Sequence, residues 1–144
     1  MITRTAITDD DGTGTTGTVI NAAWKTELYD QIDALVAGVN TLTDGATVAL
    51  NAGLPGGVYR LVAAGDRTIL APTNATSGQK IIIQHVASGS TRTLTLTTGS
   101  AGAFRFGSDI TAMTVTASGK TDYIGCVYNG TDSRWDVVAY SKGY

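Results

Sequence analysis

Few residues in this chain have side chains suited to acid–base, nucleophilic or metal chemistry. There is one histidine, His85, one cysteine, Cys126, and one glutamate, Glu27, while the remaining acidic residues are all aspartates. A closed zinc site needs four ligands, so His85 and Cys126 alone are too few. We therefore expect no catalytic residue, no metal site and no cofactor.

His85 follows two isoleucines at intervals of two residues, within the most β-prone run of the chain, residues 80–86. In a strand, residues two apart share a face, so this spacing predicts a buried histidine rather than a catalytic base. Cys126 is flanked by Gly125 and Val127, and we interpret it as a small buried apolar side chain.

Two further patterns suggest chemistry but lack its complete residue set. Asp9, Asp11 and Gly12 resemble half of a calcium loop, but no closing acid follows before Glu27, which favours a polar turn. Glycosidases generally need a pair of carboxylates at a defined separation, whereas the aspartates here are mainly in predicted turns. We therefore expect that the protein is not an enzyme.

The C-terminal aromatic residues have two open interpretations. They would form a ligand platform for sugars, or they would pack in the core or an interface on two strands joined through Asn129-Gly130. The residues of this candidate platform are Tyr123, Tyr128, Trp135 and Tyr140.

The composition predicts mainly strands and turns to position these residues. Threonine, glycine and alanine together supply 60 of the 144 residues, and threonine favours strands whereas glutamate, a helix former, occurs once. The net charge of −2 argues against binding of nucleic acid or of a membrane surface. We find no transmembrane segment and no secretory signal in the sequence.

The N-terminal part, residues 1–45, is predicted to contain an extended arm and one helix. Residues 9–18 include no apolar side chain, so they cannot contribute to a core, although Ile2 and Ile7 could anchor the arm to a neighbour. Asn21 is a suitable N-cap for a helix over residues 21–40.

Apolar residues in and just after this helix alternate at spacings of four and three. This is the heptad seam of a coiled coil, formed by Leu28, Ile32, Leu35, Val39 and Leu42. Two interpretations stay open: the helix packs on its own β domain, or it forms a short parallel bundle between subunits. Because isolated helices of this length are marginal, such a bundle would also require contacts between the β domains.

Residues 46–144 are predicted to form the second domain, with about eight strands at spacings of 8 to 14 residues. The expected strands are residues 47–50, 57–63, 80–86, 91–97, 103–106, 110–116, 121–128 and 133–140. This pattern predicts an antiparallel β-sandwich or jelly-roll-like fold, and because the helix precedes the strands we expect no parallel βαβ units.

Two motifs make the chain similar to virion structural proteins of tailed bacteriophages. Residues 3–25, TRTAITDDDGTGTTGTVINAAWK, with residues 27–33, resemble an N-terminal module of such proteins. The C-terminal half resembles the β domains of phage fibre and decoration proteins through residues 122–124, residues 128–130, Trp135 and residues 142–144.

This resemblance implies a homotrimeric virion component, assembled in the bacterial cytoplasm of the host. The absence of a long repetitive shaft favours a capsid-decorating (cement) protein or a short head fibre, and a tail fibre or receptor- or carbohydrate-binding tail component is the alternative. The implied partners are further copies of the chain, the major capsid protein or other virion proteins, and a host surface glycan. Attachment to the virion is assigned to Ile2, Ile7 and Trp24.

Overall fold

The computed structural model describes residue 26, residues 28–30, residue 32 and residues 38–144. The chain divides into two compact units, residues 1–35 and residues 36–144. In the first unit, Thr26, residues 28–30 and Ile32 are helical. The predicted domain division after residue 45 falls inside the second unit, which we call the β unit.

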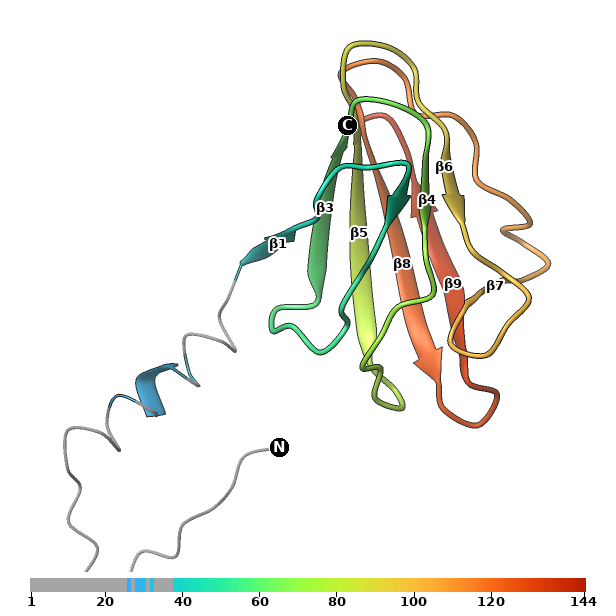
Figure 1. The fold of residues 1–144 in the computed structure, drawn as a ribbon. Coiled ribbons are helices and arrows are strands. Elements are labelled where there is room, and N and C mark those ends of the chain that lie inside the picture. The colour runs from blue at the N-terminus through green and yellow to red at the C-terminus, as the bar shows by residue number, and fades with distance from the viewer. Residues whose placement is uncertain (1–25, 27, 31, 33–37) are drawn as a thin grey trace, which may run out of the picture. The chain divides into compact units, whose positions relative to one another are not determined.

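The β unit contains nine strands in two sheets (Figure 1). The larger sheet has the order β1-β3-β5-β8-β9-β7, and the smaller has the order β2-β4-β6, with β4 and β6 drawn in front of the larger sheet in Figure 1. The strands are β1 (Val39–Thr41), β2 (Thr47–Val48), β3 (Val58–Ala63), β4 (Arg67–Ile69), β5 (Lys80–Ala87), β6 (Leu94–Leu96), β7 (Phe104–Phe106), β8 (Thr121–Asn129) and β9 (Arg134–Ser141).

The mainly β prediction is confirmed, but the wholly antiparallel arrangement is wrong. Five of the seven pairings between these strands are parallel, and only β5 with β8 and β8 with β9 are antiparallel. From β1 to β6 the chain alternates between the two sheets, so each crossover between parallel neighbours is itself a strand of the opposite sheet. The sequence argument against parallel strands failed because it considered only helical crossovers.

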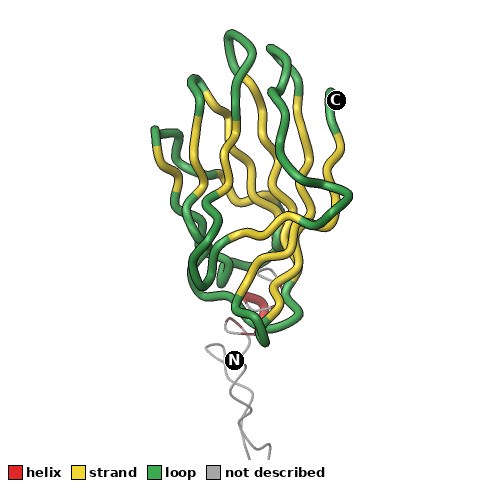
Figure 2. Tube along the Cα trace, turned by 90° about the vertical axis from the view of Figure 1, so that its right-hand side faces the viewer, coloured by secondary structure: helices red, strands yellow, loops and turns green. Residues whose placement is uncertain are grey.

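Alternation along the strands separates an inner from an outer side of each sheet. In β5, Ile81, Ile83 and His85 are buried between the sheets, whereas Lys80 and Ile82 are exposed on the other side. The core between the sheets also contains the large side chains of Tyr59, Leu61, Phe104, Ile124 and Trp135. Figure 2 shows the strands running along a common direction, with loops at both ends.

The predicted strand over residues 110–116 is not formed. In this segment only Thr116 forms a β-bridge, which is an isolated antiparallel bridge to Arg92. Residues 107–115 instead form no strand, and residues 111–113 line a groove of about 380 Å³ together with Leu94, Leu96 and Phe106.

Candidate assembly face

The larger sheet of the β unit carries exposed apolar side chains on the side that faces away from the smaller sheet. The register aligns one outward-facing residue from each of five neighbouring strands, and all five are apolar or glycine. They are Val39, Val58, Ile82, Gly125 and Ala139. We call the outward-facing side of this sheet the outer face.

Further apolar side chains extend this row on both sides. Val62 and Val86 pair on one side of it, and Val127 lies on the other. The ring of Tyr123, also outward, packs edge-on against Tyr144 with centroids 5.3 Å apart. The outer face therefore carries one apolar row across its width. The next row, Thr41, Arg60, Gln84, Tyr123 and Ser141, is mainly polar and separates it from Val62 and Val86.

Several of these side chains are large and exposed. The exposed fractions are 47% for Val39, 42% for Val62 and 44% for Ile82, and Val138, beside a β-bulge, is 58% exposed. Parallel sheets are normally covered on both faces, and contiguous exposed apolar surface in a soluble protein generally marks an interaction site. The outer face is therefore the strongest candidate for a binding surface.

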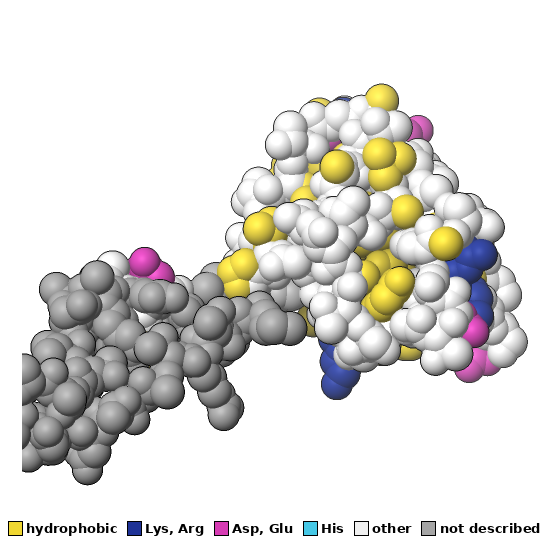
Figure 3. Space-filling view, turned by 60° about the horizontal axis from the view of Figure 1, so that its bottom comes forward, with side chains coloured by type: hydrophobic (Ala, Val, Ile, Leu, Met, Phe, Trp, Pro, Cys, Tyr) yellow, Lys and Arg dark blue, Asp and Glu magenta, His cyan; other side chains and the backbone are white. Residues whose placement is uncertain are grey.

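Charged residues border this apolar surface. Arg60 and Lys80 are exposed on β3 and β5, on either side of the apolar row. At the opposite edge of the sheet, Arg105 contacts Asp136 at 2.7 Å and Asp132 at 3.0 Å. Figure 3 views the β unit from the end at the bottom of Figure 1, where basic and acidic side chains both appear and apolar side chains reach the surface in separate groups.

The predicted helical seam does not lie on one helix. Leu28 and Ile32 are helical and exposed, and Leu35 lies outside the described residues. Val39 begins β1, and Leu42 follows that strand, is buried in the core of the β unit and donates its backbone N–H to Arg60 O at 2.8 Å. The spacing of Val39 and Leu42 from Ile32 suits a heptad, but Val39 lies in β1 and Leu42 directly follows it, so neither residue extends the helix.

The predicted aromatic platform is divided between the two sides of the larger sheet. Tyr123 is on the outer face, whereas Trp135 is fully buried on the inner side. Tyr128 and Tyr140 pack against the core, and the Tyr128 and Trp135 rings are 5.1 Å apart. These four residues therefore do not form one surface that a sugar could stack on.

A buried hydrogen-bond relay occupies the inner side of β5 and β8. Nδ1 of His85 lies 2.8 Å from Oγ1 of Thr116, and the Thr116 hydroxyl donates to Oδ2 of Asp122 at 2.8 Å. Asp122 also accepts from Tyr140 OH at 3.0 Å and from the backbone N–H of Gly143 at 2.9 Å. The relay thus fastens the segment before β8 and the C-terminal residues to the sheet.

The relay determines which nitrogen of His85 carries the proton. Because the single hydroxyl proton of Thr116 is donated to Asp122, Thr116 must accept from Nδ1–H. Nε2 is buried without a hydrogen-bond partner among the described residues. Burial lowers the pKa of His85, and the negative charges of Asp122 and Asp66 oppose this shift. His85 is therefore held neutral in the folded protein.

The neutral state of His85 predicts loss of stability in weak acid. Below pH 6.5 the unfolded chain binds a proton at His85 that the folded chain does not, so the free energy of unfolding falls as the pH decreases towards the lowered folded pKa. One such group contributes a slope of at most about 1.4 kcal/mol per pH unit. Urea unfolding between pH 7 and pH 5 measures this slope, and His85 is the only histidine.

The matched control is the His85→Asn variant, which keeps an N–H donor in place of Nδ1 but cannot be protonated in this range. We expect it to be less stable than the wild type at pH 7 and to show a flat profile between pH 6.5 and pH 5. Equal slopes in the two proteins would contradict the assignment of a buried, neutral His85.

Among the other residues singled out in the sequence, the structure describes Cys126. Burial raises the pKa of the Cys126 thiol to about 12, so it is a poor nucleophile. Within the described residues, no group of three or more His, Cys, Asp or Glu side chains could hold a metal ion. Ile2, Ile7 and Trp24, predicted to attach the protein to the virion, lie outside the described residues.

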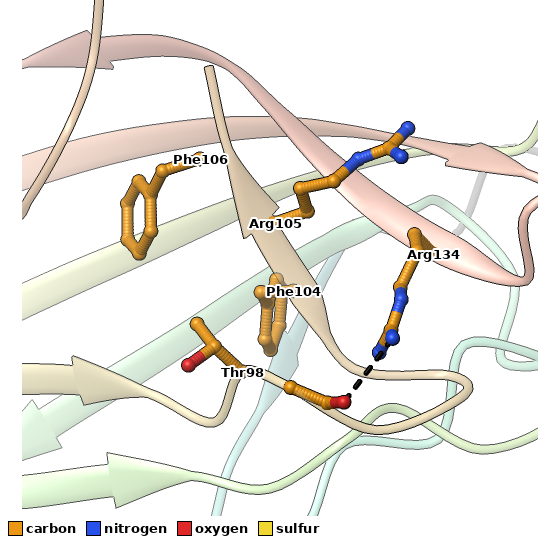
Figure 4. A pocket seen from close by; sticks show the side chains of 6 residues that line it. Thr98, Phe104, Arg105, Phe106 and Arg134 are labelled. Carbon is orange, nitrogen blue, oxygen red and sulfur yellow. Dashed lines mark hydrogen bonds between the residues drawn. The ribbon is translucent and has the colours of Figure 1, made fainter. Parts of the chain in front are cut away.

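A small open pocket lies beside β7. It has a volume of about 250 Å³ and is lined by Phe104, Phe106, Arg134 and neighbouring residues. Figure 4 shows the Arg134 guanidinium reaching the loop after Thr98, where Nη2 donates to Gly99 O at 3.2 Å. The pocket therefore combines an aromatic wall with a cation whose Nη2 is already engaged by the protein.

In the part of the chain that the structure describes, no helix has the length and apolar character needed to cross a membrane. Comparison with known protein families, with curated proteins and with solved structures finds no match to this chain.

Proposed function

We propose that this chain is a non-enzymatic structural protein of a bacteriophage virion that assembles as a homotrimer. The observation that carries the proposal is the outer face of the larger sheet, with Val39, Val62 and Ile82 exposed on three neighbouring strands. A chain that exposes such a face gains stability when copies cover it, because burial of apolar surface is the main driving force of association.

The sequence resemblance supplies the biological setting of this proposal. Residues 3–25 resemble an N-terminal module of virion structural proteins of tailed bacteriophages, and the C-terminal half resembles the β domains of phage fibre and decoration proteins. In the proposed role, the β units form a compact trimer on the capsid, as a cement protein or short head fibre, and residues 1–25 contact the major capsid protein. The pocket beside β7, with Phe104 and Phe106, favours carbohydrate or receptor binding at the tail as the second candidate.

Electron cryo-microscopy of the virion that contains this chain tests the proposal. We expect threefold density that accommodates three β units at repeated positions on the capsid lattice. Density at the tail tip would support the second candidate instead, and absence of the protein from purified particles would overturn the virion proposal.

A further inference from the structure

We infer that the outer face binds a second copy of the chain through unlike halves: the β1-β3-β5 half of one subunit packs on the β8-β9 half of the next. This inference rests on the proposed self-assembly and adds which surfaces meet. The two halves share one continuous sheet, but they differ in both shape and charge.

The halves differ first in side-chain size. The β1-β3-β5 half presents branched apolar side chains, namely Val39, Val58, Val62, Ile82 and Val86. In the other half the same row contains Gly125 and Ala139, and a Cβ atom at Gly125 would lie only 3.2 Å from Ala139 Cβ. Within this row the side chains of the first half therefore stand higher than Gly125 and Ala139, so Ile82 of one copy can pack over the low part of the row in the next, which Tyr123 and Val127 flank.

The halves differ also in charge. Arg60 and Lys80 on the first half form no ion pair with any described residue, and both are exposed. Near the second half, the carboxylates of Asp132 and Asp136 both form ion pairs with the guanidinium of Arg105. The other nearby cation, Arg134, directs Nη2 to the Gly99 carbonyl. Contact between unlike halves brings free cations towards carboxylates, whereas contact between two first halves would bring four cations together.

Contacts between unlike surfaces have a consequence for symmetry. Each subunit uses one half to bind its first neighbour and the other half to bind its second neighbour, so the contact is heterologous, and in a trimer three such contacts form a closed ring. In the proposed trimer, the three outer faces are directed towards a common axis. Neither half then remains exposed to solvent.

Cross-linking between engineered cysteines tests this arrangement. The variants are Ile82→Cys on the first half, Ala139→Cys on the second, and the double variant, each oxidised in the full-length protein so that disulfides form directly and analysed without reductant. Within one subunit the two positions lie two strands apart, about 10 Å, which is beyond the Cα separation of a disulfide. Both positions are exposed in one subunit, and the native Cys126 is buried, so it contributes little background. On a denaturing gel we expect the double variant to shift to bands of two and three chains, whereas each single variant stays at one chain.

A double variant of Ile82→Cys with Thr95→Cys, which is exposed on the smaller sheet, is the control and should give no such bands. Cross-linking of either single variant to itself would show contact between like halves and overturn the inference. Absence of cross-links in the double variant, with a trimeric mass in solution, would overturn it while leaving self-assembly intact. A monomeric mass would remove the proposed assembly as well.

Discussion

The Asp122→Ala variant is expected to lose about 3 kcal/mol of unfolding free energy, because it leaves several buried donors without their acceptor. Asp122 is buried and accepts from the Thr116 hydroxyl, the Tyr140 hydroxyl and the Gly143 N–H. Removing the carboxylate also removes the Gly143 contact, so the C-terminal residues are held on β8 only by the backbone hydrogen bonds between Thr121 and Tyr144 and by the Tyr123–Tyr144 ring contact. For a domain of this size, the loss corresponds to a decrease in melting temperature of about 10 °C.

Thermal and urea unfolding measure this effect, and Asp109→Ala is the matched control. Asp109 is exposed and accepts a 3.4 Å hydrogen bond from the Ser108 hydroxyl, so its replacement should change stability by no more than about 0.5 kcal/mol. If Asp122→Ala were as stable as this control, the relay would not be a principal anchor of the fold.

The Ile82→Asp variant is expected to remain folded and to lose the assembly completely. Ile82 lies at the centre of the apolar row and points away from the core, so an aspartate there stays hydrated in a separate subunit. In the proposed trimer, each contact would bury that carboxylate against valine and alanine side chains. An unpaired buried charge costs several kcal/mol, and the trimer would contain three of them.

Sedimentation or light scattering, combined with circular dichroism, separates loss of assembly from loss of folding. Thr95→Asp is the control, because Thr95 is exposed on β6 in the smaller sheet and lies outside the outer face. We expect the control to keep the wild-type mass. A trimeric Ile82→Asp protein would exclude the outer face as the subunit interface.

Seven of the nine strands of the β unit could be located from the sequence, but their partners could not. β5, β8 and β9 are long runs with alternating or continuous apolar residues, and the prediction found each of them. Alternation with a period of two is the same for parallel and antiparallel neighbours, so it gives no information on pairing. β4 has only three residues and one buried apolar side chain, so its sequence shows no alternation from which a strand could be predicted.

The same limits explain what was predictable about the candidate face. His85 was predicted to be buried from its phase with Ile81 and Ile83, and the structure confirms this. Ile82 was the available signal for the outer face, because three consecutive isoleucines are typical of a strand with apolar contacts on both sides. The row from Val39 to Ala139 could not be predicted, since it depends on the register of strands up to 100 residues apart.

The solution mass of the full-length wild-type protein at micromolar concentration tests the central claim, self-association as a trimer, most directly. We expect a single species of about 44 kDa, three times the chain mass of 14.8 kDa. Closure of an apolar interface over the outer face should keep this mass constant as the salt concentration is raised, since burial rather than charge dominates the association. A homogeneous 14.8 kDa species under these conditions would contradict the claim.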